Sequence, residues 1–180
     1  MQLRVRPPIH AMDLVGPVLV ALVYICACSF FPEPNRRNFN AIMIAGAGAA
    51  YLNGGFGAWE FVFTMIITYF AYRGLRSYNF IGIGWLLHTG WDVLHHLYGN
   101  PIVPFAASSS LGCAICDPVI ATWCFIGAPS ILEQMQSSSP QSGYPMKGAR
   151  REGAASDCAK WKARMVSYFI VVFLGSYKGG

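Results

Sequence analysis

Charge is what this sequence has least of. Only 12% of its 180 residues are Asp, Glu, Lys or Arg, whereas soluble domains contain about 25%. Residues 14–31 form an uncharged run of 18 positions, near the lower limit for a helix that crosses a bilayer. A signal peptide is the alternative for this run, because Arg4 and Arg6 precede it, but the run is long for one and further apolar runs follow. The shortage of charge therefore favours an integral membrane protein, with the lipid bilayer as its partner.

A basic stripe interleaved with base-stacking aromatics is also missing, which argues against a nucleic-acid partner despite the net charge of +5. The basic residues lie in a tail segment, 147–164, and in two short connections that hold Arg36, Arg37, Arg73 and Arg76. By the positive-inside rule these connections are cytoplasmic. We therefore expect the N-terminus outside and the tail in the cytoplasm, although Arg4 and Arg6 argue weakly against this orientation.

The cysteines do not form the framework of a secreted disulfide protein. Most of the six lie in apolar segments, where a thiol commonly behaves as a small hydrophobe. Cys113-x-x-Cys116 has two interpretations, a thiol redox pair or two buried structural cysteines, and we favour the second. Cys26-x-Cys28 has the wrong spacing to supply the second pair of a zinc domain.

The apolar runs and the Pro, Gly and Arg breaks between them predict an all-α fold, a polytopic transmembrane helix bundle with about five spans and at most six. The expected helices are 14–31, 39–56, 58–72, 78–98 and 111–128.

Three regions are expected along the chain: an N-terminal segment (1–13), the bundle (14–131) and a basic, disordered tail (132–180). The apolar segment 165–177 in the tail is short for a span, so we expect it to be interfacial rather than a sixth helix. A patch of small residues at 45–50 would let helices approach closely, and it makes a homodimer plausible.

The expected helix 78–98 carries an ionisable face. At about 100° per residue, His88, Asp92 and His95 fall on one face about 60° wide. His96 lies at the margin of that face. Ionisable groups in a membrane helix are costly and usually face the bundle interior or a cavity, so this face is the candidate functional site.

The first hypothesis for this face is a metal site, because imidazole and carboxylate suit zinc or non-haem iron. Glu60 and Asp117 are the candidate catalytic residues, which would complete the shell or act as a base toward a metal-bound water. The candidate ligands are His88, Asp92, His95 and His96.

Two other interpretations stay open: a buried polar network that fixes helix packing, and a proton path. The function is accordingly either that of a membrane-embedded metal-dependent enzyme or that of a non-catalytic carrier or assembly subunit.

Several long motifs resemble an uncharacterised family of small bacterial integral membrane proteins, a domain of unknown function. The resemblance covers roughly 13–131 and implies a multi-pass protein of the bacterial inner membrane, but it implies no reaction. The motifs lie at 36–43, 45–52, 54–60, 72–77, 82–88, 91–96 and 109–118, and they include Gly54-Gly55-Phe56-Gly57, Trp91-Asp92-x-x-His95-His96 and Cys113-Ala114-Ile115-Cys116-Asp117-Pro118.

A weaker likeness is to seven-helix membrane hydrolases that hold zinc with three histidines and an aspartate. The residue types match those of the helix 78–98. The arrangement differs, because those enzymes spread their ligands over several helices, so the likeness is an analogy only.

Overall fold

The structure, a computed structural model, describes residues 11–52, 55–99, 101–103, 106 and 108–131. These residues form five α-helices and no strand, which confirms the all-α fold. The predicted N-terminal segment lies almost wholly outside the described residues, and the tail with its apolar segment 165–177 lies outside them entirely. The helices are α1 (Ala11–Cys28), α2 (Asn35–Ala49), α3 (Ala58–Gly74), α4 (Tyr78–Tyr98) and α5 (Ser109–Phe125).

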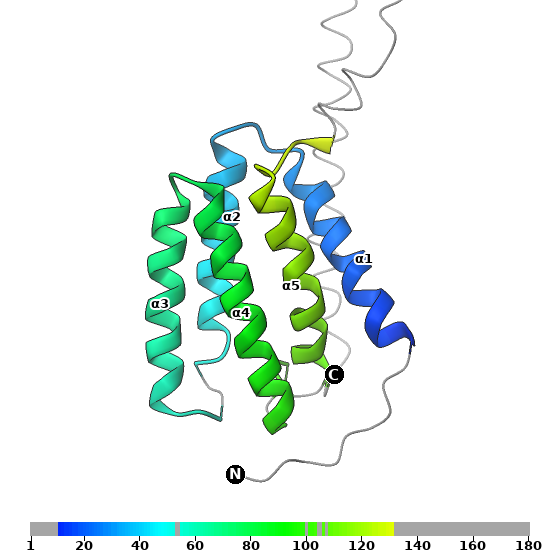
Figure 1. Ribbon diagram of the computed structural model, residues 1–180, viewed down its shortest axis with the longest axis vertical. Coiled ribbons are helices and arrows are strands. Elements are labelled where there is room, and N and C mark those ends of the chain that lie inside the picture. The colour runs from blue at the N-terminus through cyan, green and yellow to red at the C-terminus, as the bar shows by residue number, and fades with distance from the viewer. Residues whose placement is uncertain (1–10, 53–54, 100, 104–105, 107, 132–180) are drawn as a thin grey trace, which may run out of the picture. The chain divides into compact units, whose positions relative to one another are not determined.

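Helix α4 is central to the arrangement, because it packs against α5, α3 and α2 (Figure 1). Helix α1 packs mainly against α5 and makes few contacts with α2. Successive helices run in opposite directions along the bundle. The α1–α2 connection, the α3–α4 turn and the end of α5 therefore lie at the same end (Figure 1).

Helix α2 lies earlier in the sequence than predicted, at Asn35–Ala49 instead of 39–56. The prediction took Pro34 as part of a break, but Pro34 occupies the N-cap position. Proline is compatible with a helix start, because the backbone N–H groups of the first turn have no partner within the helix. At the other end the chain leaves the helix in turns at 50–52, and Tyr51 in these turns is only 2% exposed.

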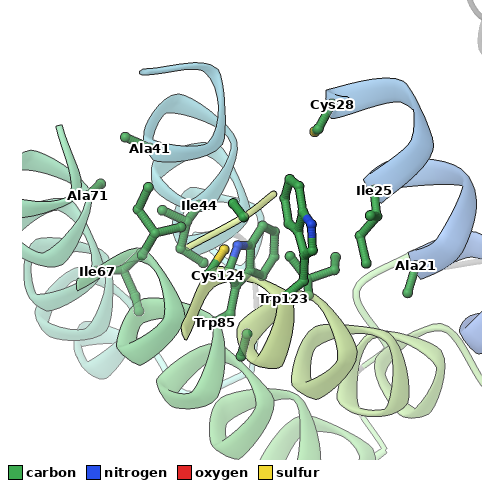
Figure 2. Packing of buried hydrophobic residues seen from close by; sticks show 14 of the residues in the cluster. Ala21, Ile25, Cys28, Ala41, Ile44, Ile67, Ala71, Trp85, Trp123 and Cys124 are labelled. Atoms are coloured by element: carbon green, nitrogen blue, oxygen red, sulfur yellow. The ribbon is translucent and has the colours of Figure 1, made fainter. Parts of the chain in front are cut away.

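The interior combines an apolar core with buried polar groups. Ile44, Trp85 and Trp123 belong to the apolar cluster shown in Figure 2. Large apolar side chains also cover the outside, with Met65 74% and Ile42 67% exposed. Among the described helices α1 has both the length and the mean hydropathy, 2.1, to cross a membrane, and α5 is apolar but shorter.

The predicted small-residue patch brings α2 onto α3 within one chain. A Cβ atom added at Gly48 would lie 2.6 Å from Cγ2 and 2.7 Å from Cβ of Ile67. Because Ile67 Cβ is fixed to the backbone of α3, the two helices would have to separate. Gly46, two residues earlier, has no heavy atom within 4 Å of the same added position.

We predict that Gly48→Ala lowers the free energy of unfolding by about 1–3 kcal/mol, as overpacking does. Gly46→Ala is the matched control and should stabilise α2 slightly, since alanine favours a helix over glycine by about 0.5–1 kcal/mol. Thermal unfolding of both variants under the same solution conditions measures the difference. Equal melting temperatures for the two variants would show that α2 and α3 do not pack through Gly48.

Candidate metal centre

The ionisable face of α4 points into the bundle. His88 is 1% exposed, and Asp92 and His95 are each 0% exposed. His96 is half-buried beside this face. Asp117 of α5 and Glu60 of α3 are also buried, at 3% and 1% exposure, so both candidate acids lie in the same interior.

His88 meets two carboxylates with a single ring nitrogen. Its Nδ1 lies 2.8 Å from Oδ2 of Asp117 and 2.9 Å from Oδ2 of Asp92. Its Nε2 lies 3.0 Å from the carbonyl oxygen of Ala47 in α2. Because a carbonyl only accepts, Nε2 must carry the hydrogen and donate it to Ala47. The Nδ1 atom is therefore the one that faces both acids.

Because His88 Nδ1 is shared, one carboxylate oxygen of Asp92 is left without a hydrogen bond. Its Oδ2 atom is buried and has no hydrogen bond, although His88 Nδ1 lies only 2.9 Å away. One proton at Nδ1 cannot point at two carboxylates, and the hydrogen bond goes to Asp117. His88, Asp92 and Asp117 each direct one possible ligand atom at the others, and these atoms lie within 4.8 Å of one another. The described residues thus contain a buried His/Asp group that could bind a metal ion.

The other carboxylate oxygen of Asp92, Oδ1, lies at the end of a pair of hydrogen-bonded hydroxyl groups, those of Tyr51 and Ser110. Tyr51 donates its hydroxyl hydrogen to Asp92 Oδ1. The Ser110 hydroxyl lies 2.9 Å from the Tyr51 oxygen and also accepts the backbone N–H of Ile102 at 3.0 Å. Since Tyr51 has one hydrogen and gives it to Asp92, Ser110 donates to Tyr51. A chain of hydrogen bonds therefore runs from the α4–α5 connection to Asp92.

Glu60 forms the centre of a second polar group. Its Oε1 lies 3.1 Å from His95 Nε2, and its Oε2 accepts the Trp91 indole N–H at 2.9 Å. The ring of Tyr51 stacks on His95 with the ring centroids 3.8 Å apart. Tyr51 thus touches both groups, through its hydroxyl and through its ring.

The structure divides the residues proposed from the sequence between these two groups. It brings His88 and Asp92 together and adds Asp117, proposed from the sequence either as part of the shell or as a base, at a possible ligand position. It places His95 beside Glu60 instead. Cys113 and Cys116 are free thiols on α5 and stand outside the possible ligand group.

Tyr51, Ser110 and the Ala47 carbonyl were not proposed from the sequence. Tyr51 and Ala47 lie on different segments from Asp92 and His88, which they contact, and Ser110 lies on a different segment from Tyr51. Helical periodicity relates residues on one helix and carries no information about such partners. The only hint was that Ser110 belongs to a run of three serines at the start of the segment that carries Asp117.

The fold and the site together define the class: an all-α protein with a buried His/Asp group that could hold a metal ion. The chain belongs to a family of unknown function, DUF6010, which matches residues 12–130. This confirms the resemblance to an uncharacterised family, with nearly the predicted span of 13–131. No curated protein and no solved structure matches the chain.

We predict that Tyr51→Phe lowers the free energy of unfolding by about 1–3 kcal/mol, because it removes the donor to a buried carboxylate. Tyr72→Phe is the matched control, since Tyr72 is 62% exposed, and it should change stability by less than about 0.5 kcal/mol. Chemical denaturation of both variants under the same solution conditions makes the comparison. If the two variants were equally stable, the bond between Tyr51 and Asp92 would contribute nothing.

Proposed function

We propose that the chain is an integral membrane protein of about five spans that binds one divalent metal ion through His88, Asp92 and Asp117. In this proposal the protein is a metal-dependent enzyme that acts on a lipid or another apolar substrate. The observation that carries the proposal is the set of hydrogen bonds around the ligand atoms.

Two of the atoms that a metal ion would not use, one on His88 and one on Asp92, already have fixed partners. His88 directs Nε2–H at the Ala47 carbonyl, and Asp92 accepts the Tyr51 hydroxyl on Oδ1. Metal-binding histidines almost always donate their second ring N–H to a carbonyl or carboxylate, and ligating carboxylates are hydrogen-bonded in turn. These bonds leave Nδ1 of His88 and Oδ2 of Asp92 directed at the same place, as ligand atoms of a metal centre would be.

Charge balance supports a divalent cation. With a neutral imidazole and two ionised carboxylates, the three groups carry a charge of −2. All three are at most 3% exposed, and burying charge without compensation is costly. One divalent ion neutralises the group, as two bound protons would. A zinc ion with bonds of about 2.1 Å needs its ligand atoms about 3.4 Å apart, so the contacts of 2.8 and 2.9 Å would have to widen by about half an ångström.

Three protein ligands leave a zinc ion with an open position, which catalytic zinc sites use for water or substrate. Zinc or ferrous iron suits one imidazole with two carboxylates. The Glu60–His95 pair is a neighbour of this group, because the ring of Tyr51 stacks on His95 while its hydroxyl donates to Asp92. We propose it as the proton acceptor. A metal ion held by His88, Asp92 and Asp117 would supply activation of water for hydrolysis, and the Glu60–His95 pair would accept the proton.

The proposed membrane location is supported by the distribution of side chains, which is the reverse of that in a soluble protein: ionisable groups lie inside and large apolar groups outside. Ionisable groups such as Glu60 and Asp92 are buried, whereas Met65 and Ile126 are 74% and 68% exposed. A bilayer would cover these apolar groups, and ionisable residues of membrane helices face the interior. With 15 residues α2 is about 22 Å long, shorter than the bilayer core of about 30 Å, and short spans are accommodated by local thinning of the bilayer.

The metal proposal predicts one bound equivalent of Zn²⁺ or Fe²⁺ in detergent-purified protein that has first been stripped with chelator. Asp117→Asn and His88→Ala should each weaken binding by more than the roughly 10–100-fold cost of losing an outer hydrogen-bond partner. His96→Ala is the matched control and should bind as the wild type does, because His96 lies outside the ligand group.

Calorimetry in buffers of different ionisation enthalpy gives a second measurement, since an ion that replaces two bound protons should release up to two per site at neutral pH. Substoichiometric metal in the wild type, unchanged in His88→Ala, would overturn the metal proposal. The buried group would then be a structural or proton-holding network, and the non-catalytic carrier or assembly subunit would be favoured.

The proposed topology in a bacterial inner membrane places the α3–α4 turn in the cytoplasm and the α2–α3 connection outside, with the N-terminus outside. We predict that an epitope inserted after Gly57 is accessible to antibody in spheroplasts. An epitope inserted after Arg76 should be accessible only after the cells are broken. The reverse pattern would invert the orientation, and labelling of both epitopes in intact spheroplasts would contradict a membrane-spanning bundle.

A further inference from the structure

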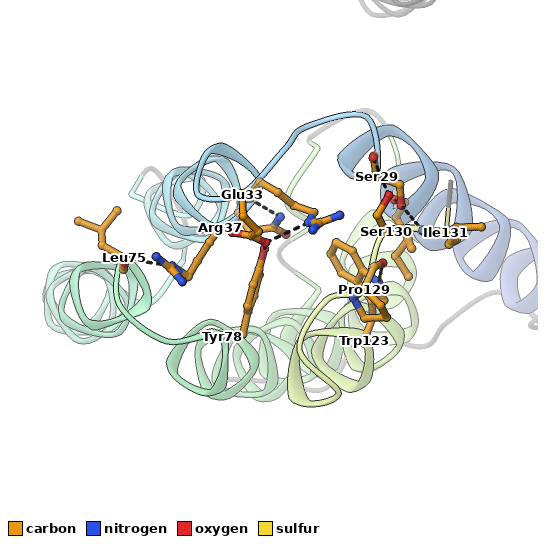
Figure 3. Close-up of polar contacts among 12 residues, drawn as sticks. Ser29, Glu33, Arg37, Leu75, Tyr78, Trp123, Pro129, Ser130 and Ile131 are labelled. Carbon is orange, nitrogen blue, oxygen red and sulfur yellow. Dashed lines mark hydrogen bonds and ion pairs between the residues drawn. The ribbon is translucent and has the colours of Figure 1, made fainter. Parts of the chain in front are cut away.

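One end of the bundle gathers arginines that lack acidic partners. The α1–α2 connection and the α3–α4 turn meet at this end (Figure 1). Arg36 is paired with Glu33 at 3.1 Å, and Tyr78 also donates to Glu33 at 2.6 Å (Figure 3). In the described part of the chain the other arginines at this end have no carboxylate within ion-pair distance. They are Arg37, Arg73 and Arg76.

Two of these three side chains are held in place by uncharged partners and not by a carboxylate. Arg37 donates its Nε–H to the carbonyl of Leu75 at 3.0 Å, across from α2 to the α3–α4 turn (Figure 3). Leu75 lies between Arg73 and Arg76 in the sequence, so this bond brings Arg37 to the turn that carries both. Arg73 donates to the Tyr69 hydroxyl at 3.2 Å, and its Cζ lies 4.5 Å from the Phe80 ring centroid.

Such a cluster suits a phosphate group. Guanidinium groups bind phosphate oxygens with paired hydrogen bonds, and they do so better than ammonium groups. Side chains that are already fixed lose less conformational freedom on binding. The neutral partners of Arg37 and Arg73 leave the positive charge uncompensated, so an anion would be attracted to this end.

An apolar stripe on α3 runs from the arginine cluster along the outside of the bundle. Its members repeat every three or four residues and are 44–74% exposed: Phe61, Val62, Met65, Ile66, Tyr69 and Tyr72. The 17 residues of α3 extend over about 25 Å. A free phosphate would use only the arginines, whereas a phospholipid would place its headgroup on them and its acyl chains along the stripe.

We propose that Arg37, Arg73 and Arg76 bind the phosphate of an anionic phospholipid whose acyl chains lie on the exposed face of α3. The inference rests on the proposed membrane location and is independent of the metal centre. Each basic side chain near a membrane surface contributes about 1 kcal/mol of attraction to anionic lipid.

The test compares spin-labelled phosphatidylglycerol with spin-labelled phosphatidylcholine on the full chain, reconstituted in phosphatidylcholine vesicles. We predict that the wild type prefers phosphatidylglycerol by at least about fivefold, the factor equivalent to about 1 kcal/mol. The triple variant R37Q/R73Q/R76Q should lose the preference. The triple lysine variant keeps the general attraction of a basic side chain to anionic lipid but lacks the paired donors, so it should show a smaller preference than the wild type.

The controls separate this inference from the proposals above. Ile42→Ala changes an exposed apolar residue on α2 and should leave the preference intact. A wild type that inserts but shows no preference, or a lysine variant equal to the wild type, would overturn the specific lipid site and leave the membrane proposal standing. Failure of the chain to float with vesicles would overturn both. Binding of inorganic phosphate at the same arginines, without lipid selectivity, would replace lipid by a soluble anion.

Discussion

The bundle is organised around a ring nitrogen that two acids share. His88 of α4 meets Asp117 of α5 and the Ala47 carbonyl of α2, so three helices converge on one imidazole. In a medium of low dielectric constant these attractions are strong, and a buried polar group without a hydrogen-bond partner destabilises the fold. The positions of α2, α4 and α5 are therefore constrained together, because a shift of any one would leave a buried polar group without its partner.

Close packing makes this convergence feasible. A Cβ atom added at Gly82 would lie 2.8 Å from the Phe125 ring of α5, and one at Gly84 would lie 3.0 Å from Ile44 of α2. Glycine at these two positions lets α4 approach both neighbours closely in the half of the helix that precedes His88. Helices that approach so closely can bring short side chains such as aspartate into direct contact.

The sequence was sufficient to predict five helices and the side of α4 that is buried, because both follow from patterns within one segment. The residues that contact this buried side of α4 were harder to predict. Their pairing depends on how helices that are distant in the chain are aligned along the bundle. His88 and His95 lie on the same face two turns apart, yet His88 contacts Asp117 and His95 contacts Glu60. Tyr51 could not be found from periodicity, because it lies in a turn after α2.

The packing of α1 has a consequence for how the chain is made. Helix α1 ends at Cys28, but its main partner α5 begins at Ser109, after 80 intervening residues. At about 5–20 residues per second, the ribosome needs about 4–16 seconds to synthesise that interval. During this time α1 has little to pack against, so closure of the bundle is a late event in biogenesis. A truncation before α5 would remove the main partner of α1 as well as one ligand-bearing helix.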